Sequence, residues 1–359
     1  MHPRFKYYPF HKDYTAMGNE FRPFVTFTHV ANYTSASVNT DKLGFRVQYD
    51  ADGQAIDITT LKSSYKHCNL MMGNSTSFGV DASSDKKTIS HYLQQTDIPC
   101  LNLSIRGGTT RQELITFLIL KQYLPPIKNI IFFTGITNPS LAALDASLPH
   151  PEFGGVFSEP FHFQHYRGFY QPTEDHTYTL RKGFYEKVEE KYGKAGKLAK
   201  KFYHTLFRLF QKKEQTALTP APALGFEEKM DMLLSQLHSD LQSWTAFREQ
   251  MGFKLHFILQ PSIGWTQKKL TPSENDCYST DFKKHKVYYQ RFVSQKTYTH
   301  YRDFLQKTLA QFNIDFYDAN EWLNDKKFDE ISCFTDVCHM TDEGNQIMAD
   351  FIKNELQLA

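Results

Sequence analysis

The residues of this chain best suited to chemistry are a serine in its first quarter and an aspartate–histidine pair near its end. Ser75 stands in the stretch GNST directly after a short apolar run, and Asp336 and His339 lie three positions apart in FTDVCHM. A serine hydroxyl is a poor nucleophile at neutral pH and needs a base to take its proton. Histidine suits that role, and a carboxylate on its other ring nitrogen holds the correct tautomer. These residue types predict nucleophilic catalysis, provided that the fold brings them together.

Short apolar runs with strand character alternate along the chain with segments of helical periodicity. The runs are 67–72, 99–105, 129–134, 254–260 and 313–317, and the helical segments include 110–123, 226–251, 298–312 and 341–356. This alternation predicts an α/β fold in which a parallel sheet of about five strands is covered on both faces. Ligands of such sheets bind outside the carboxyl ends of the strands. Ser75 follows the first run, so we expect it at that edge.

The organisation of the chain suggests a main domain with an extension and an insertion. Residues 1–65 are rich in Phe, Tyr, Thr, Val and Asn and carry turn signals, which predicts a β-rich extension packed on the core. Residues 66–359 form the main domain. The third and fourth runs are too far apart for a simple crossover, so we expect an insertion at 150–225.

A basic helix is expected within the insertion, at 196–213. Its apolar residues share one face and its lysines and arginines lie mostly away from that face. Packing on the domain is the interpretation we favour. A lid over the site and peripheral contact with an anionic membrane are the alternatives.

Composition narrows the class of protein. Lysine and arginine number 41 against 39 aspartates and glutamates, and a net charge of +2 argues against a nucleic-acid partner. We find neither a secretory signal nor an apolar stretch long enough to span a membrane, and we expect a cytoplasmic protein. Five cysteines, an odd number, fit reduced thiols better than a disulfide framework.

Other candidate ligands are better explained by packing. His162 and His165 near Glu159 have the spacing of metal ligands, but the segment is crowded with aromatic residues, which favours loop packing. Cys333 and Cys338 lie beside His339, but no second cysteine pair completes a zinc set, so buried thiols are the better interpretation. The glycine pair at 107–108 is not a phosphate-binding loop, because no Gly-Lys-Ser/Thr sequence follows it. We therefore predict neither a metal nor a cofactor.

Several stretches together resemble the SGNH (GDSL-type) hydrolase family. They are GNSTSFG at 73–79, NLSIRGGTT at 102–110, FFTGITN at 132–138 and FTDVCHMTDEGN at 334–345. The stretches NTDKLGFR at 39–46 and FILQPSIGWTQKKLTPSE at 257–274 resemble a bacterial subgroup of that family, without a chemical role that we can assign. The resemblance covers the chain from about residue 68, apart from the insertion. It implies a flavodoxin-like three-layer α/β/α sandwich.

The resemblance also implies the groups that would bind the oxyanion. They are the backbone N–H of Ser75, the backbone N–H of Gly107 and an asparagine amide from the third motif. This chain departs from the pattern at two places: Asn74 replaces the usual aspartate, and Thr137 stands where the asparagine is expected, with Asn138 after it. Either Asn138 reaches in after a one-residue shift, or the Thr137 hydroxyl donates, or one donor is absent.

The function that follows from the resemblance is ester hydrolysis through an acyl-enzyme. His339 would take the proton of Ser75, and Asp336 would orient His339. The substrate would be a small-molecule or glycan ester, including a short acyl or O-acetyl group on a carbohydrate. Two alternatives are acyl transfer in surface-glycan or cell-envelope synthesis, and a non-catalytic binding protein on the hydrolase fold. The sequence predicts no oligomeric state.

Overall fold

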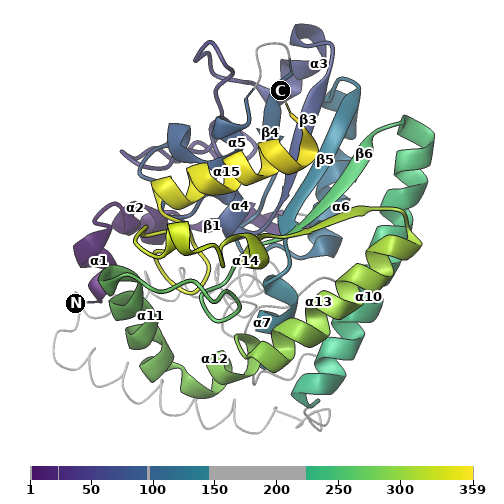
Figure 1. Ribbon diagram of the computed structural model, residues 1–359. Helices are drawn as coiled ribbons and strands as arrows, with labels where there is room; N and C mark the ends of the chain where they lie inside the picture. Colours follow the sequence, from purple (N-terminus) through teal and green to yellow (C-terminus); the bar gives the residue numbers. More distant parts are fainter. Residues whose placement is uncertain (1, 23, 95–97, 145–223, 359) are drawn as a thin grey trace, which may run out of the picture. The chain divides into compact units, whose positions relative to one another are not determined.

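The computed structural model describes residues 2–22, 24–94, 98–144 and 224–358 (Figure 1). Of the insertion expected at 150–225, only the last two residues are described. The basic segment 196–213 and the histidines at 162 and 165 therefore lie outside the described residues.

A parallel sheet of five strands forms the centre of the fold, as the apolar runs predict (Figure 1). The strands are β3 (Cys68–Gly73), β4 (Cys100–Asn102), β5 (Ile127–Thr134), β6 (Lys254–Leu259) and β7 (Asp315–Asp318). Their order in space is β4-β3-β5-β6-β7, and every neighbouring pair is parallel. The chain leaves β3 toward β4 and then returns to the other side of β3 to form β5. The order therefore reverses between β3 and β5, and such a switch point is where α/β sheets bind ligands.

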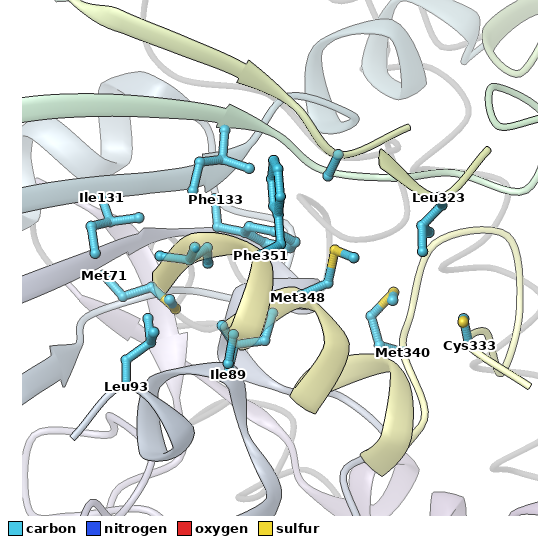
Figure 2. Close-up of a cluster of buried hydrophobic side chains, with 14 of the residues drawn as sticks. Met71, Ile89, Leu93, Ile131, Phe133, Leu323, Cys333, Met340, Met348 and Phe351 are labelled. Carbon is cyan, nitrogen blue, oxygen red and sulfur yellow. The ribbon is translucent and has the colours of Figure 1, made fainter. Parts of the chain in front are cut away.

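Helices α5 (Ile89–Tyr92), α14 (Ala319–Trp322) and α15 (Asp342–Leu356) cover one face of the sheet. Figure 2 shows the apolar cluster on this face, where Met71, Ile131 and Phe133 of the strands lie among Met348 and Phe351 of α15. All five side chains are almost fully buried.

Helices α6 (Thr110–Leu120), α10 (Phe226–Met251) and α13 (Gln295–Gln311) belong to the layer on the opposite face. Trp244 of α10 meets Phe132 of β5 with ring centroids 5.1 Å apart and Phe117 of α6 with centroids 4.8 Å apart. Successive side chains of a strand point to opposite faces. Phe132 therefore packs against this helical layer, whereas its neighbours in β5 pack against the helices on the other face. This confirms the expected three-layer arrangement.

The ends of the long helices follow from local capping. Thr341 caps α15 by accepting the N–H of Gly344, and α10 ends at Gly252 in the left-handed conformation. Helix α13 begins three residues earlier than periodicity predicts, because the Ser294 side chain accepts the N–H of Thr297. The segment 110–123 divides into α6 and a short 3-10 turn, η3 (Lys121–Tyr123).

The first 65 residues combine short helices with one antiparallel strand pair. They contain α1 (Pro3–Tyr7), α2 (His11–Ala16), β1 (Asn19–Arg22), β2 (Thr26–His29), η1 (Ile58–Thr60) and α3 (Leu61–Ser64). The remaining described elements are α4 (Ser75–Phe78), η2 (Asp85–Lys87), α7 (Thr137–Ala143), α11 (Pro272–Lys284), α12 (Lys286–Phe292) and η5 (Lys326–Phe328). Within the described ranges, no helix combines the length and apolar character needed to cross a membrane.

Candidate active site

Ser75 is placed by a tight turn at the carboxyl end of β3. A Cβ atom at Gly73 would lie 2.3 Å from the carbonyl oxygen of Phe133, so only glycine lets the two strands meet here. Asn74 then caps the short helix α4, since its Oδ1 accepts the N–H of Thr76 at 3.0 Å. Ser75 is the first residue of that helix and stands at the switch point of the sheet.

The structure brings Ser75, His339 and Asp336 into one chain of hydrogen bonds. Ser75 Oγ lies 2.7 Å from His339 Nε2, and His339 Nδ1 lies 2.6 Å from Asp336 Oδ2. The second oxygen of Asp336 accepts the backbone N–H groups of Cys338 at 3.0 Å and His339 at 2.8 Å. Both carboxylate oxygens are therefore engaged, and the carboxylate cannot rotate without losing bonds.

The tautomer of His339 follows from these contacts. An ionised carboxylate only accepts hydrogen bonds, so Nδ1 carries the proton and Nε2 accepts from the Ser75 hydroxyl. Burial opposes ionisation of Asp336, but the Arg4 guanidinium and the hydrogen bonds from His339 and the backbone hold the pKa of Asp336 well below its usual value. Asp336 is therefore ionised at neutral pH, as this argument requires.

A buried ion pair holds the loop that carries Asp336. Lys268 Nζ lies 2.8 Å from Glu274 Oε2, and both side chains are fully buried. The other oxygen of Glu274 accepts the N–H groups of Cys333 at 2.8 Å and Phe334 at 3.0 Å. The stretch 268–274, which has no role evident from sequence, thus anchors the chain just before Asp336.

Arg46 from the stretch NTDKLGFR supports the other side of the site. Its buried guanidinium donates to the carbonyl oxygens of Phe78 at 3.3 Å and Gly79 at 2.6 Å, and it pairs with Asp85 at 2.9 Å. The two carbonyls belong to the carboxyl-terminal end of α4. Arg46 therefore fixes the short helix that begins with Ser75, which gives this stretch a structural role.

Gly107 lies in a loop bonded to the end of β3. The N–H of Ile105 donates to the carbonyl of Gly73 at 3.1 Å, and Gly107 adopts the left-handed conformation with φ +71°. Among the described residues, the backbone N–H groups of Ser75 and Gly107 donate to no acceptor. Two unused donors thus come from the two turns that meet at the end of β3.

The first residue of α7, Thr137, faces the end of β3. Asn74 Nδ2 donates to Thr137 Oγ1 at 3.0 Å. Asn138 is buried and approaches the hydroxyl of Tyr301, a fully buried residue of α13, and its Nδ2 has no hydrogen-bond partner in the described parts of the chain. Of the two side chains considered as oxyanion donors, Thr137 is therefore the one that contacts the residue preceding Ser75.

Backbone groups fix the direction of the hydrogen bonds around Asn74. The N–H of Thr76 must donate, so Asn74 Oδ1 accepts and its Nδ2 donates to Gln260 Oε1 at 2.5 Å. Gln260 Nε2 in turn donates to Thr76 Oγ1 at 2.8 Å, and that hydroxyl donates to the carbonyl of Cys338 at 3.2 Å. Thr137 Oγ1 accepts from Asn74, and its own proton has no acceptor among the described residues.

Gln260 plays a part in the site that the sequence analysis missed. It directly follows the last residue of β6, just as Asn74 and Ser75 follow β3. A polar residue in that position was a usable signal, because carboxyl ends of parallel strands meet at one edge of the sheet.

Asp336, Cys338 and His339 also lie close enough to face a single ion, with ligand atoms within 4.8 Å of one another. Burial and the charge of Asp336 raise the pKa of the Cys338 thiol well above its usual value, so the thiol keeps its proton. His339 Nδ1 already donates to Asp336. These contacts account for the group without a metal. All five cysteines are buried free thiols.

Comparison with known proteins gives distant structural neighbours only. Neither a protein-family model nor a curated protein matches the sequence. An acetyl xylan esterase (AlAXEase) aligns with 80% of this chain and 99% of its own at 12% identity and a TM-score of 0.41. An acylhydrolase described as putative, from Bacteroides fragilis NCTC 9343, aligns over 87% and 91% at 11% identity and a TM-score of 0.40. A gut microbial diltiazem-metabolizing enzyme aligns over 83% and 48% at 14% identity and a TM-score of 0.37.

Proposed function

We propose that this protein is a serine hydrolase that cleaves an ester through an acyl-enzyme. The observation that carries the proposal is the continuous hydrogen-bond chain from Ser75 Oγ through the His339 ring to Asp336. In this chain Nε2 takes the serine proton as the oxygen attacks the ester carbonyl, and the same nitrogen then gives the proton to the leaving alcohol. Asp336 stabilises the imidazolium that forms between these two steps.

The oxyanion of the tetrahedral intermediate would be held by three donors. Two are the backbone N–H groups of Ser75 and Gly107, and the third is the hydroxyl of Thr137. Support for Thr137 comes from the hydrogen-bond directions, since this oxygen accepts from Asn74 and keeps its own proton to donate. Asn138 instead approaches the hydroxyl of Tyr301 in the interior. Such preorganised donors act on charge that develops only in the transition state.

Two departures from the family pattern that the motifs resemble are in direct contact and compensate each other. An aspartate at position 74 would accept from Thr137 and remove its proton from the site. Asn74 donates instead, so a threonine can stand where an asparagine is usual. The substrate we propose is an ester with a short acyl group, with O-acetylated carbohydrate as the first class to test.

The test is mass spectrometry of the intact protein after treatment with a fluorophosphonate or an activated acetyl ester. We expect one adduct, mapped to Ser75, that is absent in Ser75→Ala and forms more slowly in His339→Ala by about 10⁴-fold or more. His300→Ala, which removes an exposed histidine, is the matched control and should label like the wild type. Failure of the folded wild type to label would favour the binding-protein alternative over catalysis.

A further inference from the structure

Arg4, from the first helix of the chain, reaches the candidate catalytic residues. Its Nη1 lies 2.5 Å from Asp336 Oδ2, and its Nε donates to Asp81 Oδ2 at 2.6 Å. Its Nη2 lies 3.1 Å from His339 Nδ1, which already donates to Asp336, so this approach places a positive charge beside the ring without a hydrogen bond. The Arg4 side chain is only 12% exposed.

Asp81 is the second carboxylate of this cluster. It follows α4, is fully buried and adopts φ +67°, and it also accepts from the Thr335 hydroxyl at 2.6 Å and contacts His11 Nδ1 at 2.6 Å. Burial disfavours its ionised form, but Arg4 and His11 outweigh burial and lower the pKa of Asp81. Asp81 and Asp336 are therefore both ionised, and a single guanidinium joins them.

The other titratable groups around the cluster come from five segments of the chain. They are His2 and Asp281, which pair at 3.0 Å, His11 on α2, Cys277 on α11, Tyr289 on α12, and Cys338 in the loop before α15. Burial raises the pKa of the two thiols and of the tyrosine, so these three groups are neutral near pH 7.

Two carboxylates and one guanidinium are in direct contact with one another beside His339. The two carboxylates and Arg4 sum to one negative charge when His339 is neutral, and to zero when His339 holds the proton from Ser75. Without Arg4 these groups carry two negative charges, one more than in the wild type whatever the states of His2, His11 and Asp281, and this favours the protonated ring over the neutral base. A protonated His339 cannot act as a base.

We propose that Arg4 is a positioning residue of the active site, which cancels the charge of Asp81 and holds Asp336 against His339 so that the imidazole stays available as a base. This inference rests on the proposed function. It makes the first helix part of the catalytic apparatus, whereas the sequence suggested only an extension packed on the core.

Other contacts already dock this helix. Helix α1 packs beside α11 (Figure 1), and the Tyr7 hydroxyl donates to Asp276 at 2.8 Å. The Tyr8 hydroxyl lies within hydrogen-bond distance of the Ser332 hydroxyl and the carbonyl oxygen of Phe334. A buried charge is a costly anchor, because desolvation offsets much of its attraction. Docking alone therefore does not explain an arginine at this position.

The experiment follows fluorophosphonate labelling of Ser75 against pH in the wild type, Arg4→Gln, Arg4→Gln/Asp81→Asn and Tyr7→Phe. In Arg4→Gln the acid limb of the labelling rate should move to higher pH by about 1–2 units. The double variant removes one charge of each sign, and asparagine tolerates the left-handed conformation of position 81, so its limb should return close to that of the wild type. Tyr7→Phe loosens the helix without touching the cluster and should leave the limb in place.

A readout independent of activity separates this inference from the proposed function. The ring Cε1–H signal of His339, assigned by its loss in His339→Ala, is titrated by NMR in the same variants, and its midpoint should rise in Arg4→Gln. If the wild type never labels, the proposed function is wrong, while the NMR midpoint still reports the influence of Arg4 on the ring. If Arg4→Gln changes neither limb nor midpoint, Arg4 is only an anchor and the inference is wrong.

Arg4→Lys keeps the inference testable if Arg4→Gln does not fold. Lysine retains the charge but loses the paired geometry, so the acid limb should stay within about half a pH unit while the rate on the plateau falls. A shift of the limb by more than a full unit in this charge-preserving variant would contradict the electrostatic role.

Discussion

Replacement of Asn74 by aspartate offers a sharp test of the oxyanion assignment. The carboxylate can still accept the N–H of Thr76, so the cap of α4 survives. Its second oxygen then faces the hydroxyl of Thr137 and the side-chain oxygen of Gln260, where the amide of Asn74 now donates. Because a carboxylate cannot donate, the Thr137 hydroxyl turns to donate to it and leaves the oxyanion.

The size of the effect follows from the number of donors. Loss of one side-chain donor costs about 10²–10³ in turnover, or about 3–4 kcal/mol in the transition state. The backbone N–H groups of Ser75 and Gly107 remain, so Asn74→Asp should be slow and still active. Gln260 loses its donor, and a buried polar atom without a partner costs about 1–3 kcal/mol of stability. Thr137→Val, which removes the hydroxyl and keeps the shape, should slow the reaction by a similar factor.

The assay is the rate of acyl-enzyme formation from an activated acetyl ester, measured in the burst phase, with thermal unfolding as the folding control. Asn74→Asp/Thr137→Asn installs the pairing typical of the family that the motifs resemble, and its new amide should restore the rate by at least about tenfold over Asn74→Asp. If Asn74→Asp and Thr137→Val both react within threefold of the wild type, the hydroxyl is not the donor and the reasoning from hydrogen-bond direction fails.

Three further predictions concern the frame around the site. Burial raises the pKa of Glu113 to about 8, so between about pH 4.5 and 8 the unfolded chain loses this proton first and the stability of the fold decreases as pH rises. Glu113→Gln should therefore raise the free energy of unfolding by about 1–3 kcal/mol at pH 7 and change it little at pH 4.5. An equal gain at both pH values in urea unfolding would contradict this. Lys268→Met leaves the charge of Glu274 buried and unpaired, so it should lower the free energy of unfolding in denaturant by about 3–5 kcal/mol. Adding Glu274→Gln to this variant should restore part of that loss. A loss below about 1 kcal/mol in Lys268→Met would refute the role of the pair. Gly73→Ala places a Cβ atom against the carbonyl oxygen of Phe133, so it should slow the labelling of Ser75 and lower the free energy of unfolding by at least about 2 kcal/mol. A variant that is fully active and equally stable would show that the turn does not require glycine.

The strands and the position of Ser75 at the end of the first strand were predictable because their signals are local. An apolar run followed by a polar turn marks the carboxyl end of a buried strand, and the structure places Ser75 at such an end. The N-cap of α15 is likewise a local feature, with Thr341 three residues before Gly344. Short-range patterns of this kind depend on neighbouring residues alone, so they can be recognised in the sequence without knowledge of the tertiary structure.

The contacts that sequence could not supply are those between distant segments. Nothing near Arg4 in MHPRFKYY indicates that its partners are Asp81 and Asp336. The choice between Thr137 and Asn138 was also open, because it depends on which way Asn74 and Gln260 orient their amides. Hydrogen-bond direction is a property of the assembled network, and no single residue in it determines the outcome.

The contact between Arg4 and His339 has a consequence for how the chain acquires its fold. The two residues are 335 positions apart, so this pair closes a very long loop. The entropy cost of closing a loop that long can be repaid only after the segments between its ends have condensed. During synthesis the first helix emerges long before the loop that carries Asp336, and its arginine remains solvated until that loop arrives. The helix therefore docks late in folding, and a chain that stops short of that loop holds Ser75 without His339.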